Sequence, residues 1–81
     1  MLVKIISLDR TIFEGETEFI VVPAKGGQLT ILPHHVPLIC PLVRGKIRVK
    51  EEEKEKIFEI EEGILKVDKE GVKILITPHG I

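Results

Sequence analysis

Aromatic residues are scarce in this sequence, which contains no tryptophan, no tyrosine and three phenylalanines among 81 residues. Its 12 basic and 13 acidic residues leave a net charge of −1. Proteins that bind nucleic acids combine a positive field with aromatic platforms on which bases stack, and this chain has neither. The composition therefore disfavours nucleic acid as a partner.

Cysteine and long apolar runs are also scarce. The single cysteine, Cys40, cannot form an internal disulfide, so the fold must depend on its core or on partners. The chain has no apolar run of about 18 residues that could span a bilayer. Residues 1–8 lack the basic start and the small-residue cleavage site of a secretory signal. We therefore expect a cytoplasmic protein without a transmembrane segment of its own.

The residues that are present describe one small globular domain. Hydrophobic residues make up 43% of the chain and charged residues 31%, a balance typical of folded rather than disordered sequences. Eighty-one residues are too few for two independent cores. We expect a single domain over residues 1–81.

Alternation of apolar and polar residues dominates the chain, and no segment sustains helical spacing. The clearest case is the segment 46–50, in which Ile47 and Val49 are predicted to face the core. Short strands without helical crossovers predict an all-β fold, an antiparallel β-sandwich or flattened barrel of two sheets. The predicted strands are residues 2–7, 11–13, 17–22, 28–32, 36–42, 46–50, 56–61, 64–67 and 72–76.

Two hairpin turns can be predicted from their composition. Residues 51–55 form a charged run between two alternating segments, which is typical of a solvated hairpin tip. In the segment 68–71, Asp68 can bond to the turn backbone and Gly71 can adopt a left-handed conformation. We expect a loop of three to five residues there.

No combination of residues predicts a reaction centre. His34 and His35 are adjacent, so in an extended segment they point to opposite faces, and with Cys40 and His79 they match no zinc spacing. The carboxylates of residues 51–55 lie among lysines on an exposed turn and lack the pocket that a pair of catalytic carboxylates needs. The sequence predicts no catalytic residue, no cofactor and no metal.

Two apolar runs break the alternation. Residues 36–43 and 19–22 are apolar on both faces, whereas a strand with one solvated face should alternate. Another part of the chain or a partner must therefore cover the second face. Exposed apolar surface of this kind commonly marks an interface.

The segment 23–38, PAKGGQLTILPHHVPL, resembles the signature G-E-L-x-x-x-P-G-H-x-P-L of the epsilon subunit of F-type ATP synthases. Two further segments are similar to the family, residues 11–16 to its early F-x-G turn and residues 63–67 to its G-[IF]-L-x-V strand. Gln28 stands where an acidic residue is common, and His34 stands where the family usually has glycine. The matching signature positions are Gly27, Leu29, Pro33, His35, Pro37 and Leu38.

The resemblance implies a β-sandwich of about ten strands in a non-catalytic subunit of the central stalk. In this family the sandwich packs on the gamma subunit and on the c ring, and helps to couple proton or sodium flow to ATP synthesis. Its expected location is peripheral, on the cytoplasmic side of an energy-transducing membrane such as the bacterial inner membrane. The family's C-terminal helical hairpin is expected to be absent, because the chain stops at Ile81.

The resemblance also implies two sets of contact residues. His35 is expected to anchor the docking loop, and Leu29 to be the apolar anchor on the c ring. The expected c-ring contacts are Gly26, Gly27, Gln28, Leu29, Thr30 and Ile31. The expected gamma contacts are His35, Leu38, Ile39 and Cys40.

Two other classes of protein remain open from the residues. A free-standing β-sandwich module for a small ligand or carbohydrate would need exposed aromatic platforms, whereas Phe13, Phe19 and Phe58 all lie in apolar strand patterns typical of a core. A small hydrolase or metalloenzyme would need a nucleophile with a base, or a metal set, and neither pattern is present.

Overall fold

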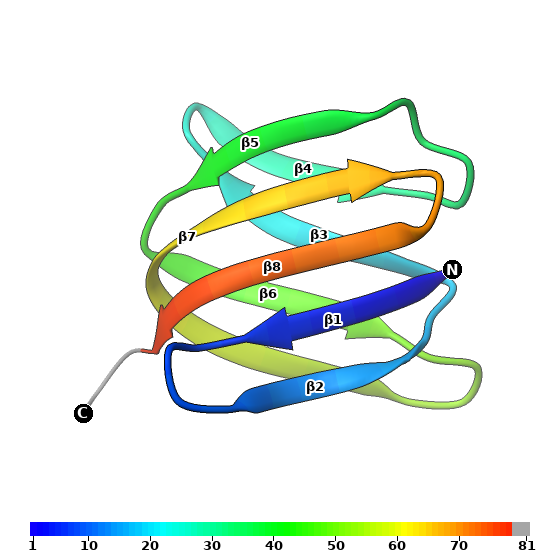
Figure 1. The fold of residues 1–81 in the computed structure, drawn as a ribbon, viewed down its shortest axis with the longest axis horizontal. Coiled ribbons are helices and arrows are strands. Elements are labelled where there is room, and N and C mark those ends of the chain that lie inside the picture. The colour runs from blue at the N-terminus through cyan, green and yellow to red at the C-terminus, as the bar shows by residue number, and fades with distance from the viewer. Residues whose placement is uncertain (79–81) are drawn as a thin grey trace.

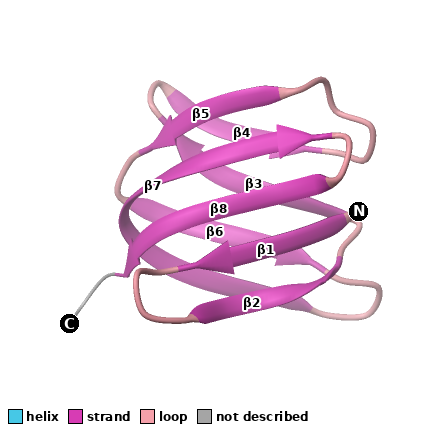
Figure 2. Cartoon of the chain, in the orientation of Figure 1, coloured by secondary structure: helices cyan, strands magenta, loops and turns pink. Residues whose placement is uncertain are grey.

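A computed structural model describes residues 1–78 of the chain, and these residues form strands joined by short loops (Figure 1). Figure 2 shows that no helix interrupts them, so no helix of the described part could cross a membrane. The eight strands are β1 (Leu2–Ile6), β2 (Thr11–Glu16), β3 (Phe19–Ala24), β4 (Gly27–Ile31), β5 (Leu38–Leu42), β6 (Gly45–Lys50), β7 (Glu55–Asp68) and β8 (Gly71–Pro78).

The strands form two layers of a flattened sandwich, as the alternation predicts. The front layer in Figure 1 follows the order β2-β1-β8-β7-β5, and the rear layer contains β4, β3 and β6. β7 belongs to both layers, because residues 55–60 pair with β6 whereas residues 62–68 pair with β8. The two layers also meet where Ala24 of β3 pairs with Leu42 of β5. The predicted all-β sandwich is confirmed.

The strand count differs from the prediction because β7 is one continuous strand of 14 residues. Two separate strands were expected on either side of Gly63, giving nine, and the family resemblance implied about ten. β7 instead bends where its register with β8 shifts between Ile60 and Glu62. A Cβ at Gly63 would lie 2.7 Å from the carbonyl oxygen of Leu75, so glycine here permits close strand pairing rather than ending the strand.

Two further expectations about the backbone are wrong. Residues 11–16, expected to contain a turn, form strand β2 throughout. The strands are also not all antiparallel, because β1 pairs with β8 in parallel, with Val3 opposite Val72. Local patterns cannot reveal this pairing, since it joins the two ends of the sequence.

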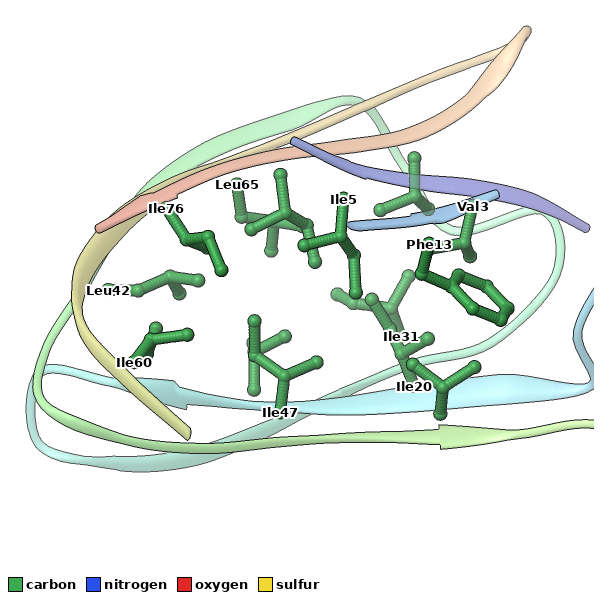
Figure 3. Packing of buried hydrophobic residues seen from close by; sticks show 14 of the residues in the cluster. Val3, Ile5, Phe13, Ile20, Ile31, Leu42, Ile47, Ile60, Leu65 and Ile76 are labelled. Atoms are coloured by element: carbon green, nitrogen blue, oxygen red, sulfur yellow. The ribbon is translucent and has the colours of Figure 1, made fainter. Parts of the chain in front are cut away.

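The core lies between the layers and consists almost entirely of aliphatic side chains (Figure 3). Ile47 and Val49 are fully buried, as predicted, and Ile60 of β7 is fully buried beside them. The rings of Phe13 and Phe58 pack with their centroids 5.9 Å apart. Phe19 does not follow the prediction, since it is half-buried and lies outside this cluster.

Both predicted hairpin turns are present. Residues 51–54 connect β6 and β7, and the backbone N–H of Glu51 donates to the carbonyl oxygen of Lys54 at 2.8 Å. At the second turn, a carboxylate oxygen of Asp68 accepts a hydrogen bond from the backbone N–H of Glu70 at 2.8 Å. Asp68 pairs directly with Gly71, so this loop has two residues rather than the expected three to five.

Candidate docking surfaces

The tip of the β3–β4 hairpin is a narrow, open turn. Ala24 pairs with Gly27, which leaves Lys25 and Gly26 as the two turn residues. Both glycines have positive φ, 92° for Gly26 and 141° for Gly27, as the sequence predicts. Apart from the adjacent residues in the chain, no heavy atom lies within 4 Å of the position that a Cβ would occupy at either glycine. Another chain can therefore approach this backbone closely.

Strand β4 divides the predicted c-ring residues between its two faces. Gln28 and Thr30 are exposed. Leu29 is half-buried and packs against the core, whereas Ile31 is fully buried within it. The side chain of Ile31 therefore cannot reach a partner, because alternation along β4 turns it inward. The exposed part of this candidate surface consists of the two glycines, Gln28 and Thr30, and Leu29 is accessible in part.

The β4–β5 loop, residues 32–37, contains both central histidines. The backbone N–H of His35 donates to the carbonyl oxygen of Leu32 at 3.2 Å, and its ring Nδ1 donates to the carbonyl oxygen of Val36 at 2.9 Å. Both bonds lie within the loop itself, and the anchoring of the docking loop by His35 stays a prediction. His34 is exposed and has a φ of 66°, in the left-handed region that glycine adopts most readily.

Strand β5 separates the predicted gamma-contact residues. Leu38 and Cys40 are half-buried and pack against the core, while Ile39 between them is 70% exposed. The outer face of β5 continues through exposed Pro41 to Val43, so this apolar run covers the core on one side and meets solvent on the other. Of the three predicted β5 residues, Ile39 is the most exposed to a partner, and Leu38 and Cys40 are accessible only in part.

The two candidate surfaces lie at opposite ends of β4. The turn at Gly26 precedes this strand, and the loop with His35 follows it. Five residues of strand separate them by roughly 16 Å, at about 3.3 Å per residue. One domain can therefore present the two surfaces to two different partners.

A cleft of about 660 Å³ opens beside the second surface, between residues 32–37, the start of β1 and the β7–β8 turn. Its walls include Leu2, His34 and Asp68. Among the described residues, no three His, Cys, Asp or Glu side chains come together as metal ligands, and His79 lies outside the described part. The cleft therefore offers no ready-made metal centre.

The outer face of the front layer carries apolar residues that the sequence-based predictions did not include. Ile64 is 52% exposed and Leu75 is 44% exposed, and they face each other across β7 and β8. The adjacent pairs Ile64-Leu65 and Ile74-Leu75 break the alternation in the same way as β5 does. These breaks in the alternation could have predicted the exposed apolar positions, but each pair is shorter than the runs 36–43 and 19–22.

The fold and these surfaces define a small all-β sandwich domain whose candidate functional regions are patches on its surface. The chain belongs to the family described as ATP synthase, Delta/Epsilon chain, beta-sandwich domain, whose model matches residues 1–77. The resemblance drawn from residues 23–38 is thereby confirmed.

Curated relatives support the same family. The ATP synthase epsilon chain of Herminiimonas arsenicoxydans is 41% identical over 78 residues, which cover 93% of this chain and 55% of that protein. The ATP synthase epsilon chain of Leptospira interrogans serovar copenhageni is 33% identical over 78 residues, covering 96% of this chain and 61% of that protein. The chain therefore spans little more than half the length of these relatives.

Solved structures share the fold at lower identity. A chain in the central stalk and c-ring structure of the Tetrahymena thermophila mitochondrial ATP synthase aligns with a TM-score of 0.81 and 12% identity, covering 94% of this chain and 62% of that one. A chain of the Euglena gracilis mitochondrial ATP synthase aligns with a TM-score of 0.77 and 21% identity. The alignment covers 96% of this chain and 49% of that one.

Proposed function

We propose that this chain is a non-catalytic central-stalk subunit of an F-type ATP synthase, which links the gamma subunit to the c ring during proton- or sodium-driven ATP synthesis. The observation that carries the proposal is the family match over residues 1–77, in a chain 41% identical to an ATP synthase epsilon chain. Catalysis takes place on other subunits. The chain acts as a single domain over residues 1–81, peripheral to the membrane on its cytoplasmic side.

The two candidate surfaces suit two partners of different kinds. The open glycine turn with Gln28 and Thr30 offers backbone and neutral polar groups, and we assign it to the c ring. The opposite end, with His35 anchoring its loop and Ile39 exposed on β5, is assigned to the gamma subunit. Leu38 and Cys40 support that surface from the core side.

Reconstitution of the tagged chain with purified gamma subunit and c ring tests this function. We expect a stoichiometric complex with both partners. Gln28→Arg combined with Thr30→Arg should weaken c-ring association about tenfold and leave gamma binding unchanged, because both side chains are exposed and lie on β4. Glu53→Arg, at the exposed β6–β7 turn, is the matched control. Failure of the unsubstituted chain to bind either partner would contradict the proposal.

A further inference from the structure

Strand β4 has a free edge. It stands at one end of the strand order, and among residues 1–78 its only partner strand is β3 (Figure 1). A free strand edge presents unpaired backbone N–H and C=O groups, onto which a strand of another molecule can add. Such an edge therefore needs either protection or a partner.

The backbone groups that face this edge follow from one hydrogen bond. Pro23 of β3 lies opposite Gln28 of β4. Its carbonyl oxygen accepts a hydrogen bond from the backbone N–H of Val43 at 2.9 Å, on the side of β3 away from β4, and proline has no N–H to offer. This pair is therefore not hydrogen-bonded, so the N–H and C=O of Gln28 point to the free edge. Alternation along the strand gives the backbone groups of Thr30 the same direction.

The other free edges of the described strands carry features that discourage strand addition. β2 contains two glutamates and a bulge at Ile12, where its register with β1 shifts. β5 contains Pro41, and residues 55–59 of β7 include two glutamates and a lysine. β4 reads GQLTI, without charge or proline, and its register with β3 is uninterrupted. Its edge is therefore the least protected in the described part of the chain.

We propose that β4 pairs with β4 of a second copy of this chain, antiparallel and about a two-fold axis at Leu29. In this register Gln28 of each copy lies opposite Thr30 of the other. Two hydrogen bonds in each of these pairs satisfy every backbone group that faces the edge. The rear layers of the two copies then form one continuous sheet.

The side chains of β4 favour a second copy as the occupant. Gln28 and Thr30 are exposed, uncharged and capable of hydrogen bonding, and self-pairing places one opposite the other. Leu29 meets its own copy, so no like charges oppose each other anywhere along the pair. The protected edge of β2 offers no second site for addition, so pairing closes as a dimer rather than extending into a filament.

The dimer has a consequence that rests on the proposed function. Gln28 and Thr30 belong to the surface that we assign to the c ring, and the same residues are covered when two copies pair. Self-pairing and c-ring binding therefore exclude each other. The dimer is the state of the unassembled chain, in which its unprotected edge is covered until the c ring replaces the second copy.

Two substitutions at one position separate the backbone from the side chain. Thr30→Pro removes an N–H that β3 does not use, whereas Thr30→Val keeps it. Sedimentation velocity over a series of concentrations should show a dimer of the unsubstituted chain. Thr30→Pro should weaken self-association at least tenfold, while Thr30→Val leaves it unchanged. A chain that stays monomeric throughout the series, or a folded Thr30→Pro variant that dimerises normally, would overturn the inference and leave the proposed function standing.

A charge exchange tests the register without proline. A variant with Gln28→Lys and Thr30→Lys, and a second with Gln28→Glu and Thr30→Glu, should each be monomeric, because like charges lie opposite each other in either homodimer. An equimolar mixture of the two should form a mixed dimer, since each lysine then lies opposite a glutamate. Two monomeric variants that do not associate when mixed would overturn this register.

Hydrogen exchange and competition complete the test. The amide protons of Gln28 and Thr30 should exchange at least tenfold more slowly in the dimer than in dilute solution, and that of Leu29 should not change. A dimer without this protection uses another surface and would overturn the inference. Purified c ring should dissolve the dimer, and a dimer that binds the c ring intact would overturn their mutual exclusion. Dimerisation without any c-ring binding would contradict the proposed function alone.

Discussion

His34 occupies a backbone conformation that suits a different residue. Its φ of 66° lies in the left-handed region, where a Cβ crowds the following carbonyl oxygen. The family signature usually has glycine at this position, so the unusual conformation and the departure from the signature occur at the same residue. The exposed imidazole shows no bond that holds it there among the described contacts.

We predict that His34→Gly stabilises the chain by about 0.5 to 1 kcal/mol. Relief of left-handed strain is worth about 1 to 2 kcal/mol, and the extra freedom of glycine in the unfolded chain opposes it by about 0.5 to 1 kcal/mol. Thermal unfolding of the isolated chain measures the net effect. His34→Ala is the control, since it removes the imidazole and keeps the Cβ. If the alanine variant is stabilised to the same extent, the imidazole and not the backbone is responsible.

At the level of single residues, the sequence predicted the backbone conformation of the turns better than it predicted the orientation of side chains. Positive φ at Gly26, Gly27 and Gly71 follows from the freedom of glycine alone. The family signature gives residue types along the sequence but not the face of the sheet on which each side chain lies. It therefore does not predict the orientations of Ile31 and Leu29. Alternation along β4 decides which of them can meet a partner.

The two turns that contain these glycines differ in their surroundings. A Cβ at Gly26 would meet nothing within 4 Å, whereas a Cβ at Gly71 would lie 2.6 Å from the carbonyl oxygen of Leu2. The β3–β4 turn is open, while the β7–β8 turn lies against the start of β1.

Because of this difference, we predict that replacing glycine by alanine lowers the free energy of unfolding by different amounts at the two turns. Gly26→Ala should destabilise the chain by about 1 kcal/mol through backbone strain alone. Gly71→Ala should cost about 3 kcal/mol, because the clash with β1 adds to the same strain. Chemical denaturation of the two variants measures both values. Equal losses in the free energy of unfolding would show that β1 moves away from the added Cβ without destabilising the chain. The pairing of β1 with β8 would then contribute little to stability.

At the level of whole strands, local patterns predicted the hairpins and missed the long-range pairing. The segment 46–50 and the strand after the charged turn were predicted because alternation and turn composition act within a dozen residues. The parallel pairing of β1 with β8 depends on contacts between Val3 and Val72, far apart in the sequence. The continuity of β7 through Gly63 was missed because glycine also commonly ends strands.

At the scale of the molecule, one hydrophobic cluster joins both layers. Ile5 of the front layer and Ile47 of the rear layer are both fully buried in it. Neither layer has a separate core among the described residues, and β7 runs through both of them.

Unfolding should therefore be a single cooperative transition. Ile5→Ala and Ile47→Ala should each lower the stability of the whole chain by about 2 to 4 kcal/mol. Urea titration followed by circular dichroism and by hydrogen exchange in each layer should give coincident midpoints for every variant. Separate midpoints, with Ile5→Ala affecting only the front layer, would show two independent units and contradict a single domain.

The passage of β7 through both layers has a mechanical consequence. For the layers to slide past each other, β7 would have to lose pairing with β6 on one side or with β5 and β8 on the other, since its backbone is continuous between them. The sandwich should therefore resist shear as a stiff body. If the sandwich turns as part of a rotor, a stiff body of this kind deforms little under torque. Elastic twist must then be stored in its partners, and this domain transmits torque with little delay.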